Sequence, residues 1–441
     1  MTTGRANTPL SQERSFDLPS VHEAWLPKEH TLYRPRHGER QSPALVTAMI
    51  FFCTPLLLLV LGVRPEAFEN RPLAAFPSPG QGWGFFTGFE PWAADNLPLR
   101  SVALDIDDQV SRRVFGEPPQ LGRQVDSGPG VGTVAPPSKS ENDRKKILAQ
   151  GFPKVLEGQD DWLYLGYDIL GACLPERPLD QVVGSMKRLQ AEVERSGRQF
   201  VLMIGPDKTT MVPQYLPAQY LGSDCARQTR DEFWRRMIAE AGATDLRPAL
   251  RTAGERRGAP VYSRLDTHWT YEGGLVMVRA IAEDIQAGVT AAWKATPSTV
   301  VERKADIPPL LGREGVFPLQ NYNLAPDGKT VRSRPIDSAF REPLRLTQPA
   351  GPGIVNKKVA LIGDSLTLFA TPFLAGGFSD VTVVHSDTAG TDPSAVAKIL
   401  AESDVVVVEA VERSLVGGIN PVITDAVINA IASELAKHPR R

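Results

Sequence analysis

The sequence is poor in several features that mark out particular classes of function. Its 441 residues carry a formal net charge of −2, so no strongly basic surface indicates nucleic acid as a partner. The few cysteines and histidines are not clustered with the spacing of metal ligands. No P-loop or GxGxxG pattern opens a helix. We therefore predict no metal, no nucleotide cofactor and no nucleic-acid partner.

Charge is missing altogether from one stretch near the N-terminus. Residues 44–63, ALVTAMIFFCTPLLLLVLGV, are an uncharged apolar run of 20, enough to cross a bilayer core of roughly 30 Å as a helix. A buried core helix is the alternative, but such helices rarely lack a polar face over this length. The run predicts one transmembrane helix.

The charges that flank this run predict its orientation. Two basic residues, Arg64 and Arg71, follow it closely, whereas the residues before it include Arg5, Arg14, Lys28, Arg34, Arg36 and Arg40. By the positive-inside rule, the N-terminus stays in the cytoplasm of a single-pass protein of the inner or plasma membrane. The remaining chain would then be periplasmic or extracellular. A cleaved signal peptide is less favoured, because no clear small-x-small cleavage site follows the run.

Cysteines are scarce, and their positions agree with this placement. Cys53 lies within the apolar run, which leaves Cys173 and Cys225 in the exported part. Two cysteines outside the cytoplasm can form one disulfide, so a Cys173–Cys225 bridge is predicted. Two free buried thiols are the alternative.

Composition divides the rest of the chain into regions. The predicted regions are a disordered cytoplasmic tail at 1–43, a juxtamembrane helical region at 64–116 with a helix at about 98–115, a Pro/Gly-rich linker at 117–143, and a main domain at 144–441 with an irregular, proline-rich excursion at 295–355. The main domain would carry the function.

Apolar strand-like runs alternate with helical patterns in the main domain. Runs rich in Val, Ile and Leu begin at 359, 381 and 405, and helices are expected at about 178–196, 227–241, 273–286 and 421–437. This alternation predicts a three-layer α/β/α fold with a mainly parallel sheet covered on both faces. In such sheets, functional residues collect at the carboxyl ends of the strands.

The stretch VALIGDSLTLFA, residues 359–370, places a serine at such an end. A serine at a strand-to-helix corner exposes its hydroxyl beside backbone N–H groups, which suits a nucleophile. Alternatively, Asp364 or Ser365 simply caps the following helix. The tetrapeptide GDSL alone does not decide between these interpretations.

A serine nucleophile needs a base, and histidine suits that task at neutral pH. The exported histidines are His268, His385 and His438, of which His438 lies at the C-terminus and His385 has only Asp387 nearby. His268 is preceded two residues earlier by Asp266, a carboxylate that could orient its ring. The alternative is a surface loop whose aspartate caps the helix that follows.

A family resemblance favours the catalytic interpretation. DTHW, followed about 97 residues later by GDS, resembles the membrane-anchored SGNH-hydrolase-like proteins that O-acetylate alginate and other exported polysaccharides. The further motifs that resemble this family are ENRPLAAFP, FEPWAADNLPLR, GQDDWLYL, IGPDKTTMVPQYLP and VVVVEAVERSL. The resemblance covers roughly residues 65–435. It implies an SGNH-like fold in which the acid–base pair precedes the serine, the inverse of the order in ordinary SGNH esterases.

The resemblance also implies roles for individual residues. Ser365 would be the nucleophile, His268 the base and Asp266 its orienting acid. The superfamily's oxyanion asparagine is not identified in this sequence; the backbone N–H of Ser365 is the expected donor, with Gly390 as a candidate second.

Four further residues are candidates for contact with the substrate. They are Lys208, Trp269, Glu409 and Arg413. Each also has a structural interpretation: a surface lysine, a core tryptophan, and an ion pair between Glu409 and Arg413.

Three functions remain open at this point. The first is an O-acetyltransferase that forms an acyl-enzyme on Ser365 and passes the acetyl group to a polysaccharide hydroxyl. Its donor, by the resemblance, would be a multi-span membrane acyltransferase that carries acetyl across the bilayer. The second is a carbohydrate acetyl esterase with the same triad, and the third is a non-catalytic scaffold of a polysaccharide-assembly complex.

Overall fold

The computed structural model describes residues 151–440 continuously and, before them, mainly residues 41–63, 74–78 and 82–96. The chain divides into two compact units, one containing the N-terminal helix and the other the main domain, and each is described by itself. The predicted tail at 1–43, the juxtamembrane helix at about 98–115 and the linker at 117–143 lie largely outside the described residues.

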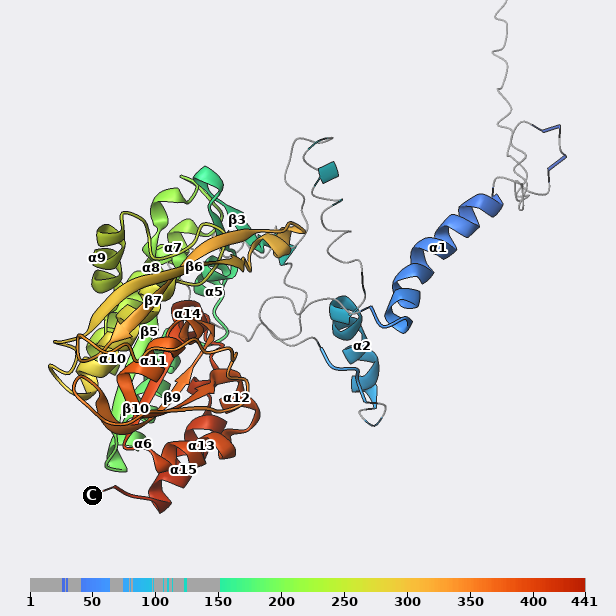
Figure 1. Ribbon diagram of the computed structural model, residues 1–441. Helices are drawn as coiled ribbons and strands as arrows, with labels where there is room; N and C mark the ends of the chain where they lie inside the picture. The colour runs from blue at the N-terminus through green and yellow to red at the C-terminus, as the bar shows by residue number, and fades with distance from the viewer. Residues whose placement is uncertain are drawn as a thin grey trace, which may run out of the picture. The chain divides into compact units, whose positions relative to one another are not determined.

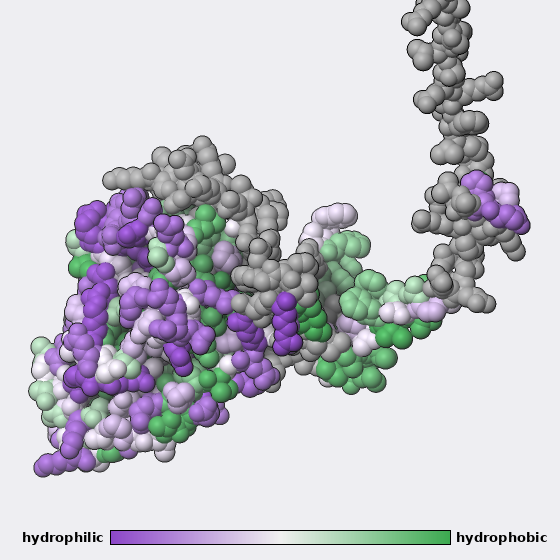
Figure 2. All heavy atoms as spheres, turned by 90° about the horizontal axis from the view of Figure 1, so that it is seen from above, coloured by the Kyte–Doolittle hydropathy of each residue, from purple (hydrophilic) through white to green (hydrophobic). Residues whose placement is uncertain are grey.

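The apolar run forms helix α1, Gln41–Val60. Its segment Ser42–Val60 is long and apolar enough to cross a membrane. Large apolar side chains along it are exposed, including Phe51 and Phe52, and the Thr54 hydroxyl donates to the Ile50 carbonyl, so that its polar group is satisfied within the helix. Figure 2 shows hydrophobic side chains gathered over the helical segments that precede the main domain, whose own visible surface is largely hydrophilic. An α1 of this kind is compatible with single-pass anchoring.

A five-stranded sheet organises the main domain (Figure 1). In spatial order, its strands are β5 (Gln199–Gly205), β11 (Val405–Val411), β9 (Val355–Gly363), β10 (Phe378–His385) and β8 (Leu344–Thr347). The first four run parallel, and β8 pairs antiparallel with β10. The predicted mainly parallel sheet is confirmed.

Every residue of the interior strand β11 is buried, which indicates that helices cover both faces of this sheet. The longer helices are α6 (Leu179–Arg195), α8 (Ser223–Ala241), α9 (Arg247–Arg257), α10 (Tyr271–Ile285), α13 (Pro393–Glu402) and α15 (Asp425–Lys437). The shorter ones are α5 (Tyr167–Cys173), α7 (Lys208–Met211), α11 (Thr371–Gly377), α12 (Ser386–Thr391) and α14 (Glu412–Val416). The helices expected near 178–196, 227–241, 273–286 and 421–437 correspond to α6, α8, α10 and α15.

The region at 295–355 is only partly irregular, which corrects the prediction. It contains β6 (Lys294–Lys304) and β7 (Val316–Ala325), which pair as a long antiparallel hairpin, and then edge strand β8 (Figure 1). The prolines of β6 and β7 are tolerated because a two-stranded ribbon leaves backbone groups without partners on its outer edges. The connection between the two strands returns to the main domain, where the Ile307 N–H donates to the Leu265 carbonyl at 3.3 Å.

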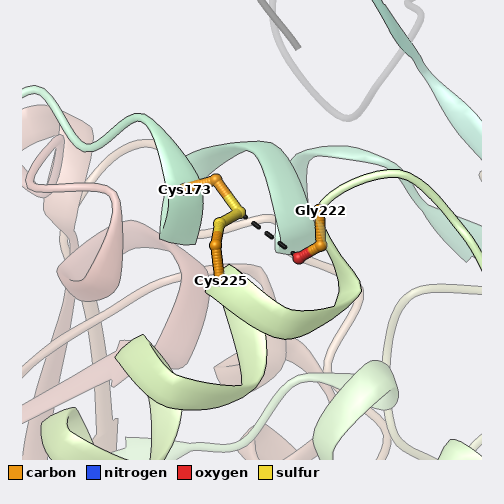
Figure 3. Close-up of a disulfide and its surroundings, with 3 residues drawn as sticks. All are labelled: Cys173, Gly222 and Cys225. Atoms are coloured by element: carbon orange, nitrogen blue, oxygen red, sulfur yellow. Dashed lines mark hydrogen bonds between the residues drawn. A yellow bond between two sulfur atoms is a disulfide. The ribbon is translucent and has the colours of Figure 1, made fainter. Parts of the chain in front are cut away.

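Two smaller features complete the domain. Strands β3 (Val155–Glu157) and β4 (Leu163–Leu165) form a short antiparallel hairpin. Cys173, at the end of α5, is joined by a disulfide to Cys225 in the first turn of α8, with the two Cα atoms 5.5 Å apart (Figure 3). This crosslink ties two helices together across 52 residues of sequence.

Candidate active site

A cavity of about 420 Å³ opens at the carboxyl end of the sheet. Residues from several separate elements line it, including Tyr167, Thr267, His268, Asp306, Ser365 and Arg413. The predicted nucleophile and base, almost a hundred residues apart in the sequence, therefore face one cavity.

The corner after β9 assigns different tasks to Asp364 and Ser365. Asp364 caps the 3-10 helix Ser365–Phe369: its Oδ1 accepts the Leu366 N–H at 3.0 Å, and its Oδ2 accepts the Val411 N–H at 2.6 Å. Ser365 is left to line the cavity. Because it occupies the first position of that helix, its backbone N–H has no acceptor within the helix and can point at a developing oxyanion.

Glu409 supports this corner from β11 below. Its Oε2 accepts the Asp364 N–H at 3.0 Å and the Thr367 hydroxyl at 2.7 Å. Burial, reinforced by the nearby Asp364, raises the pKa of Glu409 well above its usual range. Its side chain is fully buried, so the prediction that Glu409 contacts substrate is corrected: it holds the turn that presents Ser365.

His268 and Asp266 form the expected pair on the segment that leads into α10. The His268 Nδ1 lies 2.7 Å from the Asp266 Oδ1, which also accepts the His268 backbone N–H at 2.9 Å. Burial alone would lower the pKa of His268, but the Asp266 carboxylate outweighs it and raises that pKa above its usual value. The His268 Nε2 is buried and has no hydrogen-bond partner among the described residues, so it is available to a reacting group.

One hydrogen bond joins the segment that carries Asp266 and His268, called the base segment below, to the turn after β9 that carries Ser365. The Trp269 Nε1 donates to the Leu366 carbonyl at 3.0 Å. No hydrogen bond joins the Ser365 hydroxyl to His268 within the residues that the structure describes; in free enzymes such contacts are commonly long and shorten in the reactive complex. Trp269 is itself fully buried, which corrects its prediction as a sugar-binding face and matches the core alternative.

Lys208 organises the base segment from beneath. Its ammonium donates to the backbone carbonyls of Ser263 at 3.0 Å, Arg264 at 3.2 Å and Asp266 at 2.7 Å. The side chain is 1% exposed, and burial lowers its pKa to about 8. Lys208 is therefore neither a substrate contact nor a surface lysine, and both interpretations are corrected.

Arg413 is the predicted substrate contact that does line the cavity. It is the second residue of α14, and its guanidinium lies 3.2 Å from Asp207 Oδ1. Arg413 therefore pairs with Asp207 and not with Glu409, the partner in the structural interpretation. Burial would lower the pKa of Arg413, but Asp207 and Asp168 outweigh it, and the pKa is raised. The guanidinium is thus a fixed cation at the cavity wall.

Gly390 is not placed at the site. It lies within α12, where a Cβ added to it would come 2.9 Å from the Pro421 side chain, and it does not line the cavity. His385, the alternative base, instead accepts the Asp387 N–H at the start of the same helix.

Sequence reasoning missed Thr267 and Asp306. Asp306 lies in the β6–β7 connection, and its Oδ2 is 3.3 Å from the His268 Nδ1. Thr267 donates its backbone N–H to the Asp306 Oδ1 at 2.8 Å and its hydroxyl to the Asp306 Oδ2. Asp306 follows no apolar strand, so nothing in its local sequence marks it.

This cluster also bears on the expectation that the protein binds no metal. One ligand atom each from Asp266, His268 and Asp306 lies within 4.8 Å of the others, a spacing that could hold an ion. The His268 Nδ1 and the Asp266 Oδ1 are hydrogen-bonded to each other at 2.7 Å, whereas the His268 Nε2 has no partner among the described residues. The absence of a metal therefore stays a prediction.

Comparisons with known proteins identify relatives of the main domain. Residues 155–404, more than half of the chain, match the family model of the SGNH hydrolase-like domain, acetyltransferase AlgX. The chain is 27% identical over 209 residues to the probable alginate O-acetylase AlgJ of Pseudomonas putida, covering 44% of this chain and 51% of that protein. It is 28% identical over 202 residues to the protein of the same name from Pseudomonas syringae pv. tomato, covering 44% and 45%. The chain thus matches about half the length of these curated relatives.

Among solved structures, the O-acetyltransferase domain of Pseudomonas putida AlgJ is similar. The match covers 60% of this chain and 93% of that one, with 22% sequence identity and a TM-score of 0.41.

Proposed function

The chain belongs to the family of SGNH hydrolase-like acetyltransferase domains, and from that membership and the site we propose that it transfers an acetyl group to a polysaccharide hydroxyl through Ser365. The observation that carries the proposal is the shared cavity: Ser365 and the Asp266-bonded His268, from distant parts of the sequence, both line it. A nucleophile, a base and an orienting acid are the parts that acyl transfer requires.

In the first step, the Ser365 Oγ attacks the acetyl carbonyl of the donor while the His268 Nε2 takes its proton. Negative charge develops on the carbonyl oxygen, where the Ser365 backbone N–H can donate. The bond to the leaving group then breaks, the leaving group takes the proton from the imidazolium, and an acetyl ester remains on Ser365. Asp266 stabilises the imidazolium that forms in between.

In the second step, a sugar hydroxyl replaces the leaving group. His268 accepts the hydroxyl proton as the sugar oxygen attacks the acetyl ester, and the proton returns to the Ser365 Oγ when the ester bond breaks. Water in place of the sugar would give the esterase reaction with the same residues. Transferase and esterase therefore differ only in the acceptor.

The membrane helix places this chemistry outside the cytoplasm in our proposal. With the basic N-terminal segment in the cytoplasm, the main domain would be periplasmic or extracellular, anchored through α1. The acceptor would be an exported or cell-envelope polysaccharide. Because activated acetyl is made in the cytoplasm, we propose that a multi-span membrane acyltransferase supplies the donor across the bilayer.

The test uses the full chain in detergent, a chromogenic acetyl ester as donor and oligosaccharides as acceptors. We expect acetylated oligosaccharide by mass spectrometry, and we expect Ser365→Ala to abolish both transfer and ester cleavage. Ser386→Ala is the matched control, since Ser386 directly follows β10, the strand beside β9, at the same edge of the sheet.

Two outcomes would contradict the proposal. Acetate release that no sugar alters, without acetylated product, would indicate the esterase. Polysaccharide acetylation that persists in cells carrying Ser365→Ala, at normal protein abundance, would indicate the scaffold.

A further inference from the structure

We propose that Asp306 is a second carboxylate partner of the His268 imidazole, a positioning residue delivered to the base by the β6–β7 connection. The inference deepens the proposed function and rests on it for its catalytic meaning. It assigns the hairpin a part in building the active site.

Two carboxylates converge on one ring nitrogen. The His268 Nδ1 is hydrogen-bonded to Asp266 Oδ1 at 2.7 Å, and Asp306 Oδ2 lies 3.3 Å from the same nitrogen as a second charged neighbour. The Asp306 backbone N–H in turn donates to Asp266 Oδ2 at 3.3 Å. The ring and both acids therefore form one bonded cluster.

Thr267, the residue between Asp266 and His268, holds Asp306 in this position. Its backbone N–H and its hydroxyl bond to the two different oxygens of the Asp306 carboxylate. Both carboxylate oxygens are thus fixed, and the Thr267 hydroxyl is itself 3.3 Å from the His268 Nδ1. A carboxylate held at both oxygens has little freedom to turn away from the ring.

The backbone around Asp306 is fixed as well. The Ala305 N–H donates to the Gly315 carbonyl at 2.8 Å, which closes the hairpin connection, and the Ile307 N–H donates to Leu265 in the base segment. A Cβ added to Gly315 would come 2.6 Å from the Pro308 side chain, so the connection is closely packed. The hairpin delivers Asp306 to a defined place.

The charges around the ring give Asp306 an electrostatic effect. Three charged groups interact electrostatically with His268: Asp266 on its own segment, Asp306 from the hairpin connection and Arg413 from α14. Two further cations interact with the carboxylates: Lys208 with both, and Arg303 with Asp266. Asp306 raises the pKa of His268 in the same direction as Asp266. Burial and the charge of Asp266 raise the pKa of Asp306, whereas the pKa of Asp266 is lowered. Asp266 is therefore the primary partner and Asp306 the secondary one.

The experiment compares Asp306→Asn with Glu302→Gln in the full chain in detergent. Glu302 is an exposed carboxylate on β6, so its substitution removes the same charge from the same hairpin. We expect Asp306→Asn to lower the midpoint of the acidic limb of the pH–rate profile and to reduce the plateau rate about tenfold, less than loss of the primary acid would. Glu302→Gln should change neither.

A second measurement needs no turnover and so separates this inference from the proposed function. In the Ser365→Ala background, the His268 ring is titrated by NMR with labelled histidine, and its signals are assigned by their loss in His268→Ala. Asp306→Asn should lower the titration midpoint, and Asp306→Glu, which keeps the charge, should restore it in part. An unchanged midpoint in Asp306→Asn would overturn the inference, whether or not the protein transfers acetyl groups.

If Asp306→Asn fails to fold, Thr267→Val provides the same test. It removes the hydroxyl that holds Asp306 and keeps the side-chain shape. A lowered His268 midpoint would support the inference, and an unchanged one would overturn it.

Discussion

Ser365 and His268, the proposed nucleophile and base, are held in place by two different kinds of structure. Ser365 stands at the end of a buried parallel strand, and the bonds that fix its corner come from the neighbouring strand, through Glu409 and Val411. His268 lies on a segment of little regular structure, which is fixed by a buried ammonium and by an acid from an inserted hairpin. Sheet geometry positions the serine, whereas buried polar contacts position the histidine. We call the surroundings of Ser365 the serine half of the site and the segment that carries Asp266 and His268 the base half. The two halves should respond differently to substitution.

The halves meet where α10 packs on the 3-10 helix after β9. The approach is so close that a Cβ added to Gly274 would come 2.1 Å from the Phe369 carbonyl oxygen. Trp269 adds the hydrogen bond to Leu366. Both contacts join the part of the chain that carries His268 to the part that carries Ser365.

The largest loss of stability is expected for a substitution of Gly274, where α10 packs on the 3-10 helix after β9. Gly274→Ala forces α10 and the 3-10 helix apart and should cost about 3 kcal/mol in the free energy of unfolding, with loss of activity. Gly184→Ala in α6 is the control, because a Cβ there meets nothing within 4 Å, and it should stabilise the protein by about 0.5–1 kcal/mol. Equal melting temperatures for the two variants would show that the junction is loose.

The second largest loss of stability is expected when the segment that carries Asp266 and His268 loses its hydrogen bonds to Lys208. Lys208→Met leaves three backbone carbonyls without their donor and should cost about 2 kcal/mol. Activity should fall further than stability, because the Asp266 and His268 segment loses its support. Thermal unfolding and ester cleavage measure the two effects, and a stable variant with full activity would contradict this role of Lys208.

A smaller effect should appear in the pH dependence. The base must be neutral to accept a proton, and the pKa of His268 is raised, since Asp266 outweighs burial. The rate should therefore rise with pH through a midpoint above roughly 6.5 and fall about tenfold per pH unit well below it. Asp266→Asn should move that midpoint down. A midpoint below that of free histidine would contradict the assigned electrostatics.

The smallest loss of stability is expected for a substitution of Glu409, which supports the turn that carries Ser365. Burial raises the pKa of Glu409 well above its usual range, so its neutral form is favoured. Glu409→Gln replaces this carboxyl with a neutral amide of similar shape, whose oxygen can still accept the bonds from Asp364 and Thr367. We expect a loss below about 1 kcal/mol and nearly full activity. A loss as large as that of Lys208→Met would mean that both halves depend on buried charge.

The residues of the site also differ in how far they could be predicted from the sequence. Ser365 follows the apolar run 359–362, and Asp266 and His268 stand two apart in a recognisable motif, so local patterns together with the family resemblance were enough to single out all three as candidates. The parallel sheet was predicted for the same reason. Each of these features is encoded by residues close together in the sequence.

The features that were missed depend on long-range contacts. Asp306 reaches His268 only because the β6–β7 hairpin folds back over 38 residues of sequence separation, and the prolines in that region hid the hairpin. Lys208 was expected at the surface because lysine is rarely buried. Its three carbonyl acceptors come from residues more than fifty positions away.

The central claim is that His268 activates Ser365, and a covalent probe tests it most directly. A sulfonyl fluoride labels an activated serine when its oxygen bonds to sulfur, fluoride leaves and the base takes the proton. We predict labelling of Ser365 in the full chain, faster as pH rises through the His268 midpoint, and slowed by several orders of magnitude in His268→Ala. Labelling of Ser365 at the same rate in His268→Ala, with the same pH dependence, would contradict the account.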